Sequence, residues 1–251
     1  MEKIFKDKVA FITGGSFGIG RATAAAFAAR GAHVAIVDWI EDQETAERVR
    51  KAGSKALFIK CDVSQNEEVQ KAVETTVSEL GGLDFAFNNA GVEGIMAPTP
   101  ECTEENWDKT LGINLKGIWL CMKYQIPHML KKGKGAIVNC ASVAGLIGFP
   151  GLPAYVASKH GIIGLTKTAA LECAKKGVRI NAVCPGVIKT PMIDRVTGRK
   201  KEVEKAYENM EPIGRMGKPD EVAEAVVWLC SDAASFVTGA AIPVDGGWIA
   251  Q

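Results

Sequence analysis

The sequence predicts an α/β fold in which one parallel sheet carries helices on both faces. Short apolar runs rich in β-branched residues alternate with longer stretches of helical periodicity along all 251 residues. No low-complexity linker or internal repeat divides the chain, so we expect residues 1–251 to form a single domain. Strands that alternate with helices become parallel neighbours through right-handed crossovers, which predicts a doubly wound, Rossmann-like sheet of about seven strands.

The expected strands are the short apolar runs, and the expected helices are the longer periodic stretches between them. The strands lie at Lys8–Thr13, His33–Asp38, Ala56–Cys61, Leu83–Phe87, Ala136–Cys140, Val178–Val183 and Ala241–Val244. The helices lie at about Ile19–Arg30, Glu41–Ala52, Gln65–Leu80, Thr103–Leu130, Ala154–Lys176 and Pro219–Ser231. The polar stretch Thr190–Glu211 is interpreted as a mobile helical lid, which is compatible with its being a solvated surface helix.

The composition excludes several classes of function. Hydrophobic residues make up 47% of the chain and the formal net charge is +1, so there is no basic surplus for nucleic acid or anionic lipid. Charges interrupt the N-terminal apolar residues, and no apolar run reaches the roughly 18 residues of a membrane span, so we expect a cytoplasmic protein. The seven cysteines form no CxxC pair and the three histidines no HxH or HxxxH pair, which predicts reduced core thiols and no metal site.

A glycine-rich turn joins the first expected strand to the first helix. Gly14 allows a sharp turn, Gly18 a close approach of the backbone to a ligand, and Gly20 close packing of the helix. The unpaired N–H groups at a helix N-terminus bind a pyrophosphate well. A flexible turn is the simpler interpretation, and the spacing is GxxxGxG rather than GxGxxG, but the position between strand and helix favours dinucleotide binding. The predicted contacts are Gly14, Ser16, Phe17, Gly18, Ile19 and Gly20.

Polar residues follow the next three strands. Asp38 can accept hydrogen bonds from the adenosine ribose hydroxyls and would repel a 2′-phosphate. Because its neighbours Phe17 and Trp39 are not basic, we predict NAD rather than NADP, although Asp38 could instead cap the next helix. Asp62, with Val63, either contacts the adenine amino group or caps the helix after it. Asn89, Ala90 and Gly91 either contact the cofactor or form a plain turn.

Tyr155 and Lys159 lie four residues apart in an expected helix, which places both on one face. Removal of hydride from an alcohol carbon requires that the hydroxyl proton also leaves. A phenol can take that proton when a nearby ammonium stabilises the phenolate. A tyrosine and a lysine at this spacing also occur by chance on helix surfaces, so the pair gains weight only from its context.

That context is an ordered set of motifs along nearly the whole chain. The set comprises Thr13–Gly20, Asp38, Asp62, Asn88–Gly91, Asn114, Ser142, Tyr155 with Lys159, Pro185–Gly186 and Asp245–Gly247. Because these motifs occur in this order, the sequence resembles the short-chain dehydrogenase/reductase family, and its catalytic pattern shows no departure from that of the family. The resemblance implies an NAD(H)-dependent oxidoreductase that moves hydride between nicotinamide and a secondary alcohol or ketone. It also implies a homotetramer.

The resemblance further implies a role for each matching residue. Tyr155 is then the general acid/base, and Lys159 supports it and holds the nicotinamide ribose. Ser142 hydrogen-bonds the reacting oxygen, and Asn114 anchors a water that links Lys159 to solvent; its alternative is a buried amide bonded only to backbone. The residues expected around the nicotinamide are Pro185, Gly186, Val187, Ile188 and Thr190.

The substrate side is predicted from the residues beyond Ser142 and Tyr155. The candidates are Glu93, Ile95, Met96, Val143, Ala144, Leu152, Val187 and Met192, each of which could also be ordinary loop packing. They are mainly apolar and suit a hydrophobic or alicyclic alcohol at least as well as a sugar. A 3-oxoacyl thioester reductase and a sugar 1-dehydrogenase are alternatives. A non-catalytic NAD(H)-binding sensor is disfavoured, because binding alone needs no tyrosine.

Overall fold

The computed structural model describes residues 2–250, so residues 1 and 251 of the expected domain lie outside the description. Its strands are β1 (Val9–Thr13), β2 (His33–Asp38), β3 (Ala56–Lys60), β4 (Phe85–Asn88), β5 (Gly135–Cys140), β6 (Val178–Pro185) and β7 (Ala241–Val244). They form one sheet in the order β3-β2-β1-β4-β5-β6-β7, and every neighbouring pair is parallel. The predicted doubly wound sheet is therefore confirmed.

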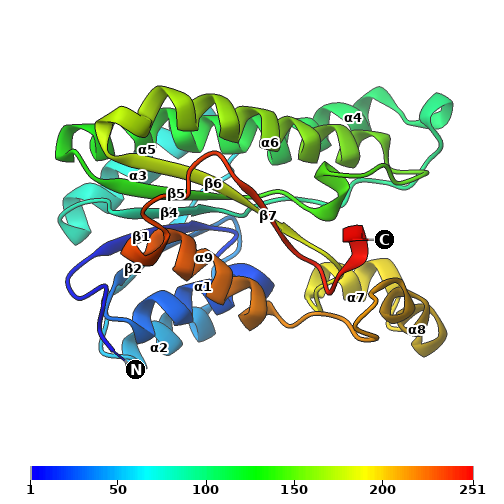
Figure 1. Cartoon of the computed structure of the whole chain (residues 1–251), viewed down its shortest axis with the longest axis horizontal. Helices are drawn as coiled ribbons and strands as arrows, with labels where there is room; N and C mark the ends of the chain where they lie inside the picture. The colour runs from blue at the N-terminus through cyan, green and yellow to red at the C-terminus, as the bar shows by residue number, and fades with distance from the viewer. Residues whose placement is uncertain (1, 251) are drawn as a thin grey trace.

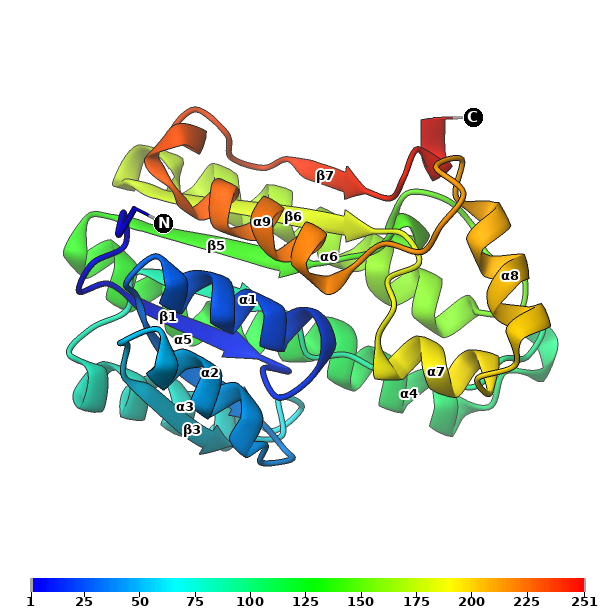
Figure 2. The same ribbon diagram turned by 90° about the horizontal axis from the view of Figure 1, so that it is seen from below.

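Helices cover both faces of the sheet (Figure 1). One layer holds α1 (Gly18–Ala29), α2 (Gln43–Lys51) and α9 (Pro219–Cys230). The opposite layer holds α3 (Asn66–Leu80), α4 (Glu104–Leu111), α5 (Gly117–Lys132) and α6 (Pro153–Cys173). Two short helices, α7 (Pro191–Thr197) and α8 (Lys201–Met210), lie beyond the carboxyl ends of the strands (Figure 2).

The strands are continuous apolar runs because both of their faces are buried. In β1 all five residues are buried, and Phe11 belongs to the core under α3, α5 and α6 while its neighbour Ile12 belongs to the core under α1 and α9. The chain leaves β1 toward β2 and β3 on one side and returns to β4 on the other. The strand order thus reverses between β1 and β4, and ligands of such sheets bind at the carboxyl ends beside this reversal.

The expected helix over Thr103–Leu130 is interrupted in the structure. Between α4 and α5 lies a five-residue π-helical turn, Gly112–Lys116, which contains the fully buried Asn114. An extra residue of this kind leaves the apolar periodicity on either side nearly unchanged, so the sequence pattern does not reveal it. Its effect is to turn Asn114 toward the loop after β4.

A buried amide network supports the sheet behind this loop. Asn88 on β4 and Gln125 on α5 exchange two side-chain hydrogen bonds, of 3.1 and 2.8 Å. Asn88 also donates to Asn139 on β5 at 3.0 Å, and Asn139 donates to Thr166 on α6 at 3.0 Å. Buried amides that satisfy one another hold one arrangement of the elements that carry them. The network therefore fixes β4 and β5 relative to α5 and α6.

Several other expectations concern the surface and the cysteines. Among the residues that the structure describes, no helix is long and apolar enough to cross a membrane. All seven cysteines are free thiols; six are buried as expected, and Cys102 is partly exposed. Trp107 on α4 and Trp119 on α5 are partly exposed. The structure describes a single chain, so the homotetramer stays a prediction.

Candidate active site

The turn after β1, residues Gly14–Gly20, needs glycine at three positions because a Cβ there would meet other protein atoms; we call it the glycine cradle. Gly14 and Gly18 have positive φ angles of 60° and 52°, which L side chains rarely adopt. A Cβ at Gly20 would overlap the carbonyl oxygen of Gly14, so the first turn of α1 can lie against the loop only because it carries glycine here. The turn therefore presents bare backbone at the N-terminus of α1, as the sequence predicts.

The loop after β4 is tied to this cradle. The Asn89 side-chain amide donates to the carbonyl oxygens of Thr13 and Gly14, at 3.1 and 3.2 Å. The Thr13 hydroxyl in turn accepts the backbone N–H groups of Asn89 and Ala90, at 2.8 and 3.0 Å. Thr13 thus has a structural role that the sequence pattern did not single out. The ends of β1 and β4 are held together where the strand order reverses.

Asp38 lies beside the glycine turn, where the sequence predicts the adenosine ribose. Its carboxylate accepts the N–H of Ser16 at 3.1 Å and that of Ile40 at 3.2 Å. The cap of α2 is Asp42, whose side chain accepts the N–H of Thr45. Asp38 is therefore not the helix cap that was its alternative interpretation.

Arg21 is a basic residue of this region that sequence reasoning missed. Its guanidinium lies 5.2 Å from the centroid of the Phe17 ring. It donates to the carbonyl oxygen of Ser16 at 2.9 Å and pairs with Asp42 at 3.0 Å and with Glu44. Arg21 is thus paired with two carboxylates beside the predicted adenosine site, one of which, Glu44, also binds Arg48.

Asp62 and Val63 follow β3 at the same edge. The Asp62 side chain accepts the N–H of Ser64 at 2.9 Å, so it closes a turn before α3 rather than capping the helix itself, which begins after Gln65. Val63 is buried and packs where α5 begins, because a Cβ at Gly117 would lie 2.8 Å from its side chain. Contact of either residue with adenine stays a prediction.

Tyr155 and Lys159 lie on the first two turns of α6. Lys159 is only 4% exposed, and its ammonium donates to the carbonyl oxygen of Cys140, the last residue of β5, at 2.8 Å. The same ammonium lies 5.5 Å from the centroid of the Tyr155 ring. A buried cation has been brought beside the phenol, as the spacing of the two residues predicts.

Asn114 connects this helix to the loop after β4. Its amide group donates to the carbonyl oxygen of Val92 at 2.9 Å and accepts the Val92 N–H at 2.8 Å. It also donates to the Ser158 hydroxyl at 3.2 Å, which in turn donates to the Tyr155 carbonyl oxygen at 2.7 Å. Asn114 is therefore bonded to a side chain as well as to backbone, and a Cβ at Gly91 would lie 3.1 Å from its oxygen.

Ser142 lies two residues after Cys140 and begins the short turn Val143–Gly145. Its backbone is extended, and its hydroxyl oxygen accepts the Ala144 N–H at 3.1 Å. A Cβ at Gly145 would lie 2.7 Å from the carbonyl oxygen of Lys159, so this turn packs directly on α6. Val143 and Ala144 are buried, so they offer little surface to a substrate.

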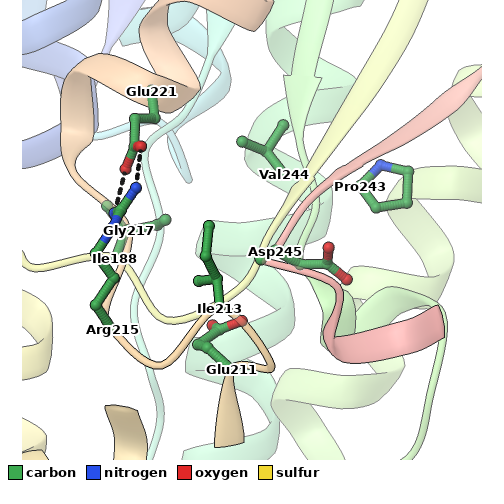
Figure 3. A pocket seen from close by; sticks show the side chains of 10 residues that line it. Ile188, Glu211, Ile213, Arg215, Gly217, Glu221, Pro243, Val244 and Asp245 are labelled. Atoms are coloured by element: carbon green, nitrogen blue, oxygen red, sulfur yellow. Dashed lines mark hydrogen bonds and ion pairs between the residues drawn. The ribbon is translucent and has the colours of Figure 1, made fainter. Parts of the chain in front are cut away.

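The loop after β6 carries the residues predicted to surround the nicotinamide. Gly186 follows Pro185, and Thr190, the residue before α7, contacts the glycine cradle, because a Cβ at Gly18 would lie 3.0 Å from its methyl group. Beside this loop lies a cavity of about 310 Å³. It is lined by Ile188, Glu211, Ile213, Arg215, Gly217, Glu221, Pro243, Val244, Asp245 and Gly246 (Figure 3). None of the four predicted catalytic residues lines it.

The predicted substrate side is partly open. Ile95 and Met96 are 70% and 65% exposed, and Met96 lies beside Gly151, just before Leu152 and the start of α6. Glu93 is engaged by the guanidinium of Arg195 on α7 through two hydrogen bonds, of 2.9 and 3.2 Å. Met192, also on α7, is partly buried. The Glu93–Arg195 pair thus joins the loop after β4 to α7.

Comparison with known proteins finds a matching family model and several similar oxidoreductases. A family model described as enoyl-(acyl carrier protein) reductase matches residues 14–249. The chain is 45% identical over 244 residues to 2,5-dichloro-2,5-cyclohexadiene-1,4-diol dehydrogenase of Sphingobium indicum, with 97% of each chain covered. It is 45% identical over 258 aligned positions to cyclohexanol dehydrogenase of an Acinetobacter species, with 100% of both chains covered. The crystal structure of levodione reductase matches with a TM-score of 0.94 at 38% identity, covering 98% of this chain and 99% of that one.

Substitution of Gly20 tests the cradle. Because the added methyl group would overlap the Gly14 carbonyl, Gly20→Ala must displace the turn, and we expect a loss of about 2 kcal/mol in the free energy of unfolding. Chemical denaturation measures this. The matched control is Gly164→Ala on α6, where a Cβ meets no atom within 4 Å and helix propensity favours alanine. Equal stability of the two variants would contradict the packing described.

Proposed function

The chain belongs to the short-chain dehydrogenase/reductase family and is an oxidoreductase acting on CH–OH donors; from this premise we propose that it is an NAD(H)-dependent dehydrogenase of alicyclic secondary alcohols. The observation that carries the proposal is the buried Lys159 ammonium beside the Tyr155 ring at the carboxyl end of β5. Such a pair serves proton transfer to or from an alcohol oxygen, and simple binding of a nucleotide has no use for it.

The residues present fit a nicotinamide dinucleotide. The glycines let the turn pack closely against the loops after β4 and β6, and the N-terminus of α1, which this turn leads into, favours a pyrophosphate. A bound nicotinamide supplies the acceptor or donor of hydride. The residues that would hold the cofactor are Gly14, Ser16, Phe17, Gly18, Ile19, Gly20, Asp38, Trp39, Asp62, Val63, Asn89, Ala90, Gly91, Tyr155, Lys159, Pro185, Gly186, Val187, Ile188 and Thr190.

The protein's own contribution is the handling of the proton. In alcohol oxidation the Tyr155 phenolate takes the hydroxyl proton, and in ketone reduction the phenol returns it. The Lys159 ammonium lies buried beside the ring, where its positive charge attracts the negative charge that the Tyr155 oxygen carries during this transfer. The Ser142 hydroxyl donates to the reacting oxygen, and Asn114 holds the start of α6 through Ser158.

The charges around Asp38 support NAD over NADP. The Asp38 carboxylate points to the N-terminal turn of the cradle, where it would accept the ribose hydroxyls. A 2′-phosphate there would meet the negative charge of Asp38. Arg21, the nearby cation, is already paired with Asp42 and Glu44, so it offers little uncompensated charge to a phosphate.

The substrate class is inferred from the surface beyond Tyr155 and from the relatives. Two relatives are named for alcohols of a six-membered carbon ring. The exposed side chains of Ile95 and Met96 provide apolar contact for such a ring and few hydrogen-bond partners for a sugar. The proposed substrate contacts remain Glu93, Ile95, Met96, Val143, Ala144, Leu152, Val187 and Met192, of which the buried Val143 and Ala144 offer the least surface.

We further propose that residues 190–211 act as a lid that the Glu93–Arg195 pair holds closed. Partial burial acts to raise the pKa of the Glu93 carboxyl, but its hydrogen bonds and the charge of Arg195 prevail, so this pKa lies below its usual value. Folding of the lid against the loop therefore favours the ionised form. The contribution of the pair is complete above the ordinary pKa of a glutamate and is lost as pH falls through the lowered value.

The proposed activity is tested by measuring NADH or NADPH formation with purified protein. Cyclohexanol, a linear secondary alcohol and glucose serve as substrates. We expect kcat/KM to be highest for cyclohexanol and at least about tenfold higher with NAD than with NADP. Asp38→Ser should reduce this cofactor ratio, whereas Glu47→Gln, on the exposed side of α2, should leave it unchanged. A higher efficiency with NADP in the wild type would refute the cofactor assignment.

Tyr155→Phe separates proton transfer from binding. Removal of the hydroxyl should lower kcat by about 10³-fold, because the alcohol proton then has no acceptor, while NADH affinity measured by fluorescence stays within about threefold. Tyr124→Phe is the matched control, since the Tyr124 hydroxyl donates to Asn66 on α3, away from α6. A parallel loss of turnover and of NADH binding would indicate a structural role instead.

The lid is tested through its ion pair. Arg195→Ala should raise KM for cyclohexanol up to about fivefold, which corresponds to an exposed pair worth up to about 1 kcal/mol, while NADH affinity is retained. Arg199→Ala, which removes a pair internal to the lid with Asp194, should have little effect. If the two variants raise KM equally, the bond between the lid and the loop after β4 does not hold the lid closed.

A further inference from the structure

A buried carboxyl group lies at the end of the lid, outside the chemistry derived above. Glu211 follows α8, and it is only 3% exposed. One carboxyl oxygen accepts the Val187 N–H at 2.6 Å, and the other has no hydrogen-bond partner among the described residues. Burial raises the pKa of the Glu211 carboxyl above its usual value. A buried polar atom without a partner costs stability, so this side chain is retained at a cost to the fold.

The space around Glu211 is shaped for a carboxyl group. A Cβ at Gly186 would overlap one of its oxygens, and a Cβ at Gly246 would lie 3.1 Å from the other. Glycine therefore stands on both sides of the group. This slot is formed by segments far apart in the chain: the end of β6, the end of α8 and the turn after β7.

Within residues 2–250, no cation holds Glu211. Arg215 lines the same cavity, but its guanidinium pairs with Glu221 through hydrogen bonds of 2.9 and 2.6 Å (Figure 3). Asp245 is engaged by backbone N–H groups of Gly247 and Ile249, at 3.1 and 3.0 Å. The partner that Glu211 does have is the Val187 N–H, so its effect passes through the loop after β6.

That loop is fastened so that the N–H and C=O of Ile188 face away from Gly217. Gly217 donates to the Val187 carbonyl oxygen and accepts the Lys189 N–H, both at 2.9 Å, which makes a parallel bridge between Ile188 and Gly217. In a parallel bridge the central residue points its own N–H and C=O away from the bridging strand. The Ile188 carbonyl accepts the Thr190 hydroxyl at 3.1 Å, and the Ile188 N–H faces the same side. Glu211 holds the preceding peptide, between Gly186 and Val187, through the Val187 N–H.

We propose that Glu211 is a positioning residue for the nicotinamide half of the cofactor. By holding the Val187 N–H, it keeps the Val187–Ile188 backbone in the orientation that the nicotinamide requires, and it ties that backbone to the end of the lid. Without this hydrogen bond, the loop must be ordered when the cofactor binds, and the affinity falls accordingly. The proposal rests on the proposed function, because it assumes a nicotinamide at this loop.

The experiment compares two ligands of the full-length protein. NADH contains the nicotinamide, and ADP-ribose contains every other part of the cofactor. Glu211→Met keeps the volume of the side chain but removes the acceptor, whereas Glu211→Gln keeps an acceptor oxygen. Glu208→Met is the control, because the Glu208 side chain pairs with Lys205 at the surface of the same helix. Dissociation constants are measured by fluorescence for NADH and by calorimetry for ADP-ribose.

We expect Glu211→Met to raise the Kd of NADH about tenfold and to leave that of ADP-ribose within about twofold, with Glu211→Gln restoring most of the NADH affinity. Equal weakening of both ligands, absence of the rescue by glutamine, or unchanged NADH binding in Glu211→Met would each overturn the proposal. Failure of the wild type to bind NADH would refute the proposed function itself, which separates the two outcomes.

Should Glu211→Met not fold, amide hydrogen exchange of the wild type decides the question. The Val187 N–H should be protected in the absence of cofactor, because the buried carboxyl group holds it. Exchange of this amide at the rate of an open loop would overturn the proposal.

Discussion

The hydrogen bond from the Lys159 ammonium to the Cys140 carbonyl is the contact on which the rest of the site depends. It joins α6 to the last residue of β5, which is still paired with Val183 of β6. A buried ammonium needs such an acceptor, and once it is satisfied the helix has one position along the strand. Tyr155 then lies one helical turn from the cation, and Ser142 lies two residues after the carbonyl that accepts it.

At the ends of β1 and β4, hydrogen bonds between neutral groups likewise fasten the strand ends. Thr13 and Asn89 join the ends of β1 and β4 by four hydrogen bonds between side chains and backbone. These bonds hold the glycine-rich turn in place between the ends of the two strands. Each half of the site is built by fastening the end of one strand, or the loop after it, to another element of the sheet edge. This is possible because all seven strands end at the same edge.

Sequence patterns predicted the parts of the site that depend on local order. The strands, the glycine turn, Asp38 and the Tyr155–Lys159 spacing are each visible within a few neighbouring residues. Arg21 and Glu211 were missed because their roles depend on partners that only the fold brings near: Arg21 reaches the cap of α2, and Glu211 reaches a peptide 24 residues earlier in the chain. The π-helical turn was missed because the helical periodicity is regular on each side of it, and the change of phase is confined to five residues.

That π-helical turn also sets how the chain tolerates changes in length. Each residue of a helix advances the direction of its side chains by about 100°. Loss of one residue between Gly112 and Lys116 would restore a regular helix, but it would rotate α4 and α5 against each other by that angle. Asn114 would then leave Val92 and Ser158, and its neighbours Ile113 and Leu115 would lose their packing against the core. The length of this turn is therefore fixed twice, by the hydrogen bonds of Asn114 and by the packing of its apolar neighbours.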